Sequence, residues 1–149
     1  MKYKKAYNDK AKAIITDAYI FPNFKPGELP KWKYYSPVVA WDTGSERSSI
    51  STEVIEALQL KPKGHTEVMV FGGSKEVGIY EISIGLPNGE VFHDVEVFGA
   101  DIDEYAALFG MDIITETDFL ITNAEKKTVF QFRTPSEGGV ELLELLSVN

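Results

Sequence analysis

The sequence contains no cysteine and only two histidines, His65 and His93, and this scarcity excludes several kinds of site. Without cysteine there can be no disulfide, no thiolate zinc site and no cysteine nucleophile. The two histidines stand 28 residues apart and form no His-Glu-x-x-His metal motif. A Ser-His-Asp triad stays open, although no Gly-x-Ser-x-Gly motif favours one. We therefore expect neither a metal nor a cofactor.

Positive charge is also scarce, because 15 lysines and arginines stand against 23 acidic residues and leave a net charge of −8. This balance argues against nucleic-acid binding by phosphate neutralisation, and weakly against an anionic membrane surface. No uninterrupted apolar run is long enough to cross a bilayer. The basic start of the chain is not followed by the apolar stretch of a signal peptide. We expect a cytoplasmic protein with no nucleic acid and no membrane among its partners.

The 149 residues suffice for one domain with its own core, and turn signals divide them into short segments. Segments rich in β-branched and aromatic residues predict strands at residues 13–21, 32–39, 66–71, 77–86, 91–98, 119–122 and 128–133. Ser51 or Thr52 can cap one short helix, with Glu53 in its first turn and Pro62 beyond its end. A second helical turn is expected at 113–117. These short intervals indicate a mainly β domain with a closed or sandwiched antiparallel sheet.

The two ends of the chain differ in composition from the predicted domain. Residues 1–12 carry five lysines and are interpreted as a solvated lead-in, with a DNA-contacting arm as the less favoured alternative. Residues 13–135 form the domain, and residues 136–149 form a tail after Pro135. Four leucines of this tail alternate with Glu141 and Glu144, a pattern more typical of a core or an interface than of a docking peptide.

The segment at residues 38–45 carries the strongest chemical signal. An apolar run, interpreted as a buried strand, leads to Asp42 in a tight turn made with Thr43, Gly44 and Ser45. A carboxylate placed directly after a buried strand is held rigidly and partly desolvated, as catalytic carboxylates are. Gly44 lets the backbone turn sharply, and the two hydroxyls can donate hydrogen bonds. We predict that Asp42 is one half of a catalytic carboxylate pair; the alternative is a solvated turn aspartate.

Three later features follow this turn in a fixed order. They are Gly72-Gly73 between two predicted strands, the turn at residues 86–89, and the segment Leu108-Phe109-Gly110-Met111-Asp112. Together with the Asp-Thr-Gly-Ser turn, they make the sequence resemble the retropepsin-like aspartic proteases over roughly residues 13–132. The resemblance implies a single-domain, closed antiparallel β-barrel with one or two short helices that acts as a homodimer on extended peptide or protein substrates.

The resemblance also implies roles for individual residues. Asp42 would be catalytic, Thr43 would lock two active turns together, and Gly44 would line the cleft beside Ser45. The flap over the substrate would be formed by Phe71, Gly72 and Gly73. Structural support beneath the active turn would come from Leu108, Phe109, Gly110 and Asp112, with no chemistry assigned to Asp112.

Two features depart from the family pattern. Trp41 is larger than the aliphatic residue usual before the aspartate, and the chain continues for 37 residues beyond Asp112. The chemistry of the family needs two carboxylates that share a proton, and this chain holds a single Asp-Thr-Gly. The second acid must therefore come from a second copy. We expect an aspartic endopeptidase with an acidic pH optimum; the alternative is a degenerate domain that only binds peptides or dimerises.

Overall fold

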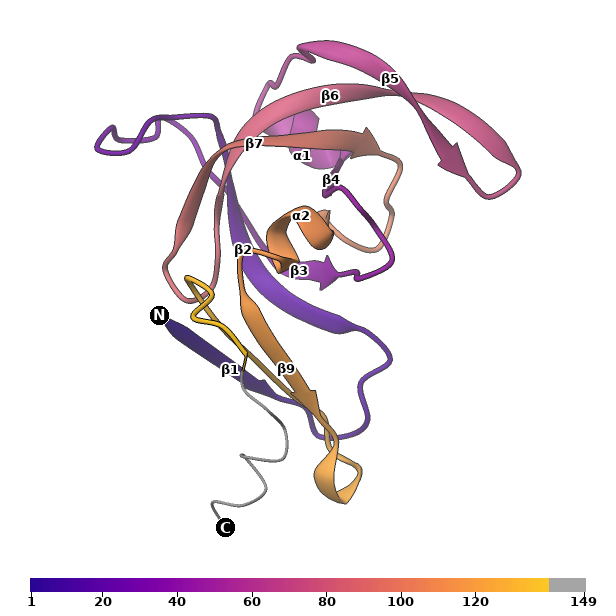
Figure 1. The fold of residues 1–149 in the computed structure, drawn as a ribbon. Coiled ribbons are helices and arrows are strands. Elements are labelled where there is room, and N and C mark those ends of the chain that lie inside the picture. The colour runs from indigo at the N-terminus through magenta and orange to yellow at the C-terminus, as the bar shows by residue number, and fades with distance from the viewer. Residues whose placement is uncertain (140–149) are drawn as a thin grey trace.

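The computed structural model describes residues 1–139, so the Leu-rich part of the predicted tail lies outside the described residues. The described chain is mainly β, with two short α-helices, as predicted (Figure 1). The strands are β1 (Lys2–Ala6), β2 (Ile14–Pro22), β3 (Tyr34–Trp41), β4 (Ser49–Ser51), β5 (Gly64–Val70), β6 (Gly73–Gly85), β7 (Val91–Ala100), β8 (Ala107–Phe109), β9 (Asp118–Thr122) and β10 (Val129–Arg133). The helices are α1 (Thr52–Ala57), α2 (Met111–Ile114) and the 3₁₀ turn η1 (Ala124–Lys126).

The strands form two sheets. The larger sheet has the order β2-β3-β8-β4-β7-β6-β5, and β6 also pairs with β2. The smaller sheet has the order β1-β10-β9. Two pairings, β3 with β8 and β4 with β7, are parallel. The expectation of a purely antiparallel sheet is therefore wrong at these two places, because a sequence pattern marks strands without showing their partners, and parallel partners lie far apart in the chain.

Helix α1 begins as its sequence predicts. Ser51 is the N-cap, and its hydroxyl accepts a hydrogen bond from the backbone N–H of Val54 at 3.3 Å. Glu53 lies in the first turn, where the helix dipole favours a negative charge. The second helix, α2, starts at Met111, two residues before the expected helical turn. No helix among residues 1–139 is long and apolar enough to cross a bilayer.

The first strand, β1, corrects the interpretation of the N-terminal segment. It pairs with β10 along its whole length, and Tyr3 packs on Phe132 with 5.3 Å between ring centroids. The Lys5 ammonium donates a hydrogen bond to the carbonyl of Ile15 at 2.6 Å. A solvated arm is therefore wrong for residues 2–6, where exposed and half-buried residues alternate in the period of a strand. The domain boundaries after residues 12 and 135 stay a prediction.

Trp41 joins the two sheets. Its indole ring lies 5.3 Å from Phe130 and 5.1 Å from Phe132 of the smaller sheet, and 5.4 Å from Phe109 of β8, measured between ring centroids. Its Nε1 donates a hydrogen bond to the fully buried Thr16 hydroxyl at 2.9 Å. The large side chain before Asp42 thus fills the junction between β3 and the additional sheet β1-β10-β9, and fixes the end of the strand from which the candidate catalytic turn leaves.

Candidate active site

Asp42 follows β3 directly and is held by its own turn. Its backbone N–H donates to the carbonyl of Phe109 at 2.8 Å, which ties the start of the turn to β8. The backbone N–H of Gly44 donates to Oδ1 of Asp42 at 2.9 Å, and the Ser45 hydroxyl donates to Oδ2 at 2.9 Å. Both carboxylate oxygens are therefore oriented. Asp42 is half-buried, whereas Thr43 and Gly44 are exposed, so the carboxylate is fixed and still reachable from outside.

Gly44 is favoured by this geometry for a steric reason. A Cβ atom at this position would lie 3.1 Å from Oδ1 of Asp42, closer than most Cβ contacts in proteins. The missing side chain lets the backbone N–H approach the carboxylate closely. The sequence predicted a sharp turn at Gly44, and the structure shows that the glycine also brings its backbone N–H to the carboxylate.

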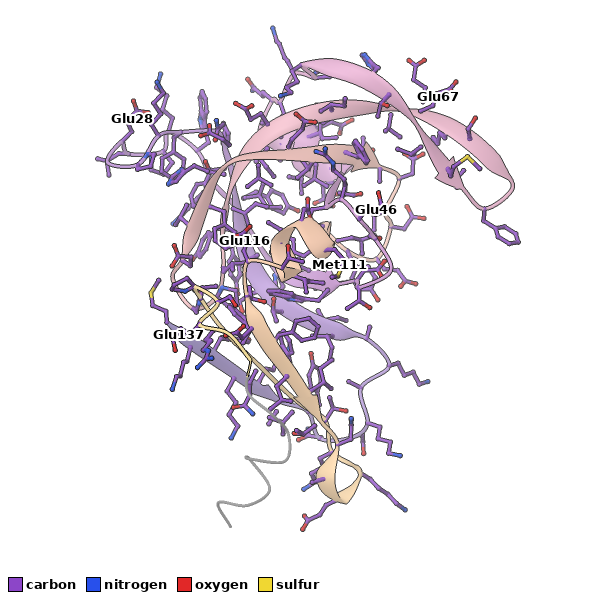
Figure 2. All side chains as sticks on the ribbon, viewed as in Figure 1. Glu28, Glu46, Glu67, Met111, Glu116 and Glu137 are labelled. Carbon is purple, nitrogen blue, oxygen red and sulfur yellow. The ribbon has the colours of Figure 1, made fainter. Side chains whose placement is uncertain are left out.

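A second segment, at the junction of β8 and α2, supports the turn from beneath. The backbone N–H of Met111 donates to the carbonyl of Ser45 at 2.7 Å, and that of Asp112 donates to the carbonyl of Glu46 at 3.2 Å. Figure 2 labels Glu46 and Met111 on the two segments that meet here. A Cβ on Gly110 would lie 2.6 Å from the Ser45 carbonyl oxygen and 2.9 Å from the carbonyl carbon of Arg47. Only glycine allows the two backbones to approach this closely.

The Asp112 carboxylate is fully engaged in this support. Its Oδ2 accepts from the Ser48 N–H at 2.9 Å, and its Oδ1 accepts from the Ser48 hydroxyl at 2.7 Å and from the Ile113 N–H at 2.9 Å. The Ser48 hydroxyl in turn accepts from the Gly110 N–H at 3.0 Å. Sequence reasoning missed Ser48, because it lies 64 residues from Asp112 and no spacing links the two.

The predicted flap residues lie at the end of the β5–β6 hairpin. Val70 pairs with Gly73, so Phe71 and Gly72 form the turn between the two strands. Gly72 and Gly73 have φ angles of 94° and 144°, which favour glycine, and the Phe71 side chain is fully exposed. The hairpin projects from the body of the molecule (Figure 1). No hydrogen bond within residues 1–139 joins its tip to the Asp42 turn, so the structure does not bring these two groups of predicted site residues together.

Comparison with known proteins shows which known fold this architecture resembles. No family model matches the sequence, and no curated protein matches it. Among solved structures, it is similar to a retropepsin-like aspartic protease from Rickettsia conorii, with a TM-score of 0.52 and 10% identity over 90% of this chain and 95% of that chain. The fold is retropepsin-like. A second structure, EIAV protease complexed with the inhibitor HBY-793, aligns with a TM-score of 0.49 and 23% identity over 72% of this chain and 89% of that chain.

Within the retropepsin-like fold, the described geometry separates the candidate residues into two groups. Asp42, Thr43, Gly44 and Ser45 form one turn, and Leu108, Phe109, Gly110 and Asp112 lie on the segment that packs against it. The first group presents a carboxylate to the outside. The second group contacts the turn and the residues after it through hydrogen bonds to their backbone and to the Ser48 hydroxyl. Their roles stay a prediction, and the geometry is compatible with the division proposed from the sequence.

An ion-pair network links the segment after the turn to β6 and β7. Arg47 Nη1 is 3.2 Å from Glu96 Oε1, and Lys63 Nζ is 2.7 Å from Glu96 Oε2 and 3.4 Å from Glu81 Oε2. The hydrogen bond from Lys63 lowers the pKa of Glu96, and the charge of Arg47 acts in the same direction. Because these side chains are 34–48% exposed, the network contributes little to stability. It ties Arg47, just after the turn, to β7.

Proposed function

We propose that this protein is an aspartic endopeptidase whose active site forms when the Asp42 turns of two copies meet across a two-fold axis. The two carboxylates would share one proton and titrate as a pair. Such a division between a carboxylate base and a carboxylic acid is established for aspartic proteases as a class. The dimer is part of the proposal because one chain contains one Asp-Thr-Gly turn.

One observation carries this proposal: the Asp42 carboxylate is oriented on both oxygens by its own turn and faces an exposed rim. Gly44 and Ser45 supply the two hydrogen bonds, while Thr43 and Gly44 remain exposed in a single copy. A second turn brought against this rim would place two carboxylates side by side. The Asp112 carboxylate, by contrast, accepts two hydrogen bonds from Ser48 and one from the Ile113 N–H, and is not available as the second acid.

The proposed chemistry uses only these two acids and water. The ionised carboxylate removes a proton from a water molecule while the water oxygen attacks the scissile carbonyl carbon. The protonated carboxylate gives its proton to the carbonyl oxygen, which produces a tetrahedral diol. Transfer of a proton to the amide nitrogen then breaks the carbon–nitrogen bond and releases an acid and an amine.

The substrate we infer is an extended peptide bound by strand-like backbone pairing, with pockets for alternate side chains. The β5–β6 hairpin, with Phe71, Gly72 and Gly73 at its tip, would cover this peptide. We also infer that the pairing of β6 with β2 closes the larger sheet into a barrel, which would give the cleft a rigid base. The glycine-containing tip would supply the mobility that opening and closing need.

Cleavage of a peptide library at acidic and neutral pH tests the proposal, with wild type compared with the variants Asp42→Asn and Asp103→Asn. Asp103 is exposed and lies in the loop after β7. Asp103→Asn therefore removes the same charge as Asp42→Asn but leaves the Asp42 turn unchanged. We expect cleavage by wild type and Asp103→Asn, and a loss of at least about a thousandfold in Asp42→Asn, the scale of removing one member of a catalytic unit. Cleavage that persists in Asp42→Asn would refute the mechanism.

Concentration dependence tests the dimer separately. We expect specific activity to rise with protein concentration and to follow the dimer fraction measured by sedimentation, because each site needs two chains. An enzyme that is active while strictly monomeric would contradict the shared pair. A wild-type protein that binds peptides but cuts none at any pH would instead support a peptide-binding or dimerisation module.

A further inference from the structure

The β2–β3 hairpin carries an exposed aromatic–lysine patch, which we define as Tyr19, Leu29, Lys31, Trp32, Lys33 and Tyr35. Leu29 is 91% exposed, Trp32 is 61% exposed and Tyr35 is 52% exposed. Figure 1 shows the loop between β2 and β3 extending away from the body, and Figure 2 labels Glu28 on it. Large apolar side chains displayed together on a projecting loop indicate an interaction surface, because single exposed ones would be scattered.

The patch is continuous at its base. Tyr19 and Tyr35 are direct partners in the pairing of β2 with β3, and their ring centroids lie 5.1 Å apart. The Lys33 ammonium lies 5.1 Å from the centroid of the Tyr19 ring, a cation–π contact. Rings and positive charge therefore share one face of the hairpin, and Leu29 and Trp32 lie on the loop that joins its two strands. The acidic member of this loop, Glu28, accepts a hydrogen bond from the Lys25 N–H.

The loop that carries the patch is locally positive. Residues 23–33 hold three lysines and one acidic residue, a net charge of +2, although the chain as a whole has a net charge of −8. Because salt screens charges beyond about 8 Å under physiological conditions, a flat anionic surface senses the local lysines more than the total.

We propose that the aromatic–lysine patch binds the interface of an anionic lipid bilayer. Tryptophan and tyrosine favour the headgroup level of a bilayer, and lysines attract anionic lipids. Insertion of an exposed leucine into the boundary with the acyl chains lowers the free energy of binding. Leu29 favours a bilayer over a nucleic acid as the partner. A nucleic acid would contact the rings and the lysines, but it has no apolar region in which an aliphatic side chain could be buried. The expectation of no membrane partner was based on the net charge of the whole chain, and this proposal replaces that expectation. It does not depend on protease activity.

Vesicle binding of the full chain tests the lysines. The probes are vesicles of phosphatidylcholine alone and vesicles with about one-third phosphatidylserine. We expect binding to the anionic vesicles only, weakened by salt, with a blue shift of tryptophan fluorescence that Trp32→Phe removes. Lys31→Asn with Lys33→Asn should weaken binding about thirtyfold, at about fivefold per lysine. The matched pair Lys126→Asn with Lys127→Asn, on the exposed turn after β9, should change it less than about threefold.

Leu29→Asn tests the apolar contribution. We expect this variant to weaken vesicle binding at least about fivefold while leaving the circular dichroism spectrum and the thermal midpoint unchanged, because Leu29 is 91% exposed in the fold. The proposal is overturned if wild type binds neither kind of vesicle, or if both lysine pairs weaken binding equally. It is also overturned if Leu29→Asn binds as wild type does while a single-stranded oligonucleotide competes, since the patch would then belong to a nucleic-acid site.

Discussion

Nε1 of Trp41 donates a hydrogen bond to Oγ1 of Thr16 over 2.9 Å, one residue before the candidate catalytic Asp42. The Thr16 hydroxyl itself donates to the carbonyl of Asp17 at 3.0 Å, so the indole N–H occupies its acceptor side. The same indole ring packs on Phe130 and Phe132. The residue before Asp42 therefore couples three elements, β2, β3 and the smaller sheet, to the start of the turn.

This coupling predicts a measurable interaction energy between Trp41 and Thr16. Thr16→Val leaves the indole N–H without its acceptor and should lower the free energy of unfolding by about 1–3 kcal/mol. Trp41→Phe keeps an aromatic ring but loses the hydrogen bond and part of the packing, with a similar expected cost of about 1–3 kcal/mol. In a urea-unfolding double-mutant cycle, the two losses should sum to more than the loss in the double variant. Strict additivity would show that the hydrogen bond contributes nothing.

Much of the fold could be predicted from local sequence signals. Gly72-Gly73, the turn after Leu86 and the cap at Ser51 each act within a few residues, so their structural consequences follow from the sequence. The expected strands are confirmed for the same reason, since burial on one face imposes a period of two.

The pairings between distant segments could not be predicted. β1 pairs with β10, which lies more than a hundred residues away in the sequence. The lysines of β1 indicated a solvated segment, although one face of the strand is half-buried. The contact between Ser48 and Asp112 and the packing of Trp41 likewise depend on which strands become neighbours. The Asp42 turn could be located from the sequence, whereas the contacts that hold it in place could not.

Gly110 offers a steric test of the support beneath the turn. Gly110→Ala would place a methyl group 2.6 Å from the Ser45 carbonyl oxygen, so β8 and the turn must separate. We expect a loss of about 1–3 kcal/mol of stability, the cost of overpacking, and a loss of cleavage activity as Asp42 moves. Gly64→Ala is the matched control, because no atom lies within 4 Å of its added Cβ. Equal thermal midpoints for the two variants would contradict the close approach.

Asp112 distinguishes a structural carboxylate from a catalytic one. In Asp112→Asn, the new amide nitrogen must replace one of two oxygens that both accept hydrogen bonds from N–H or O–H donors. A donor would then face a donor, and we expect the free energy of unfolding to fall by about 1–3 kcal/mol. Asp103→Asn should leave it unchanged within about 0.5 kcal/mol. If Asp112→Asn abolished cleavage at full stability, the residue would have a chemical role instead.

Asp118 on β9 predicts how stability responds to acid, where the proposed enzyme is expected to work. The Ser136 hydroxyl, the Glu137 N–H and the Arg133 guanidinium donate to its carboxylate at 2.6, 2.9 and 2.8 Å. These bonds, with the Ser136 hydroxyl contributing most, lower the pKa of Asp118 from 3.8 to about 2. A carboxylate with a lowered pKa in the folded state stabilises the fold above its unfolded pKa, and this stabilisation is lost as the pH falls from about 4 towards 2.

Urea unfolding of wild type and Asp118→Asn between pH 2 and pH 7 measures this contribution. We expect the wild type to be more stable by a constant margin above about pH 5, with the margin shrinking as the pH falls to about 2, because the protonated carboxyl loses its advantage over the amide. Asp103→Asn, made at an exposed aspartate, should show no comparable change over this range. A margin that grew towards low pH would have the wrong sign for a carboxylate stabilised in its ionised form. A margin retained at pH 4 would mean that Arg133 and Asp118 hold β9, β10 and residues 136–137 together under the acidic conditions proposed for catalysis.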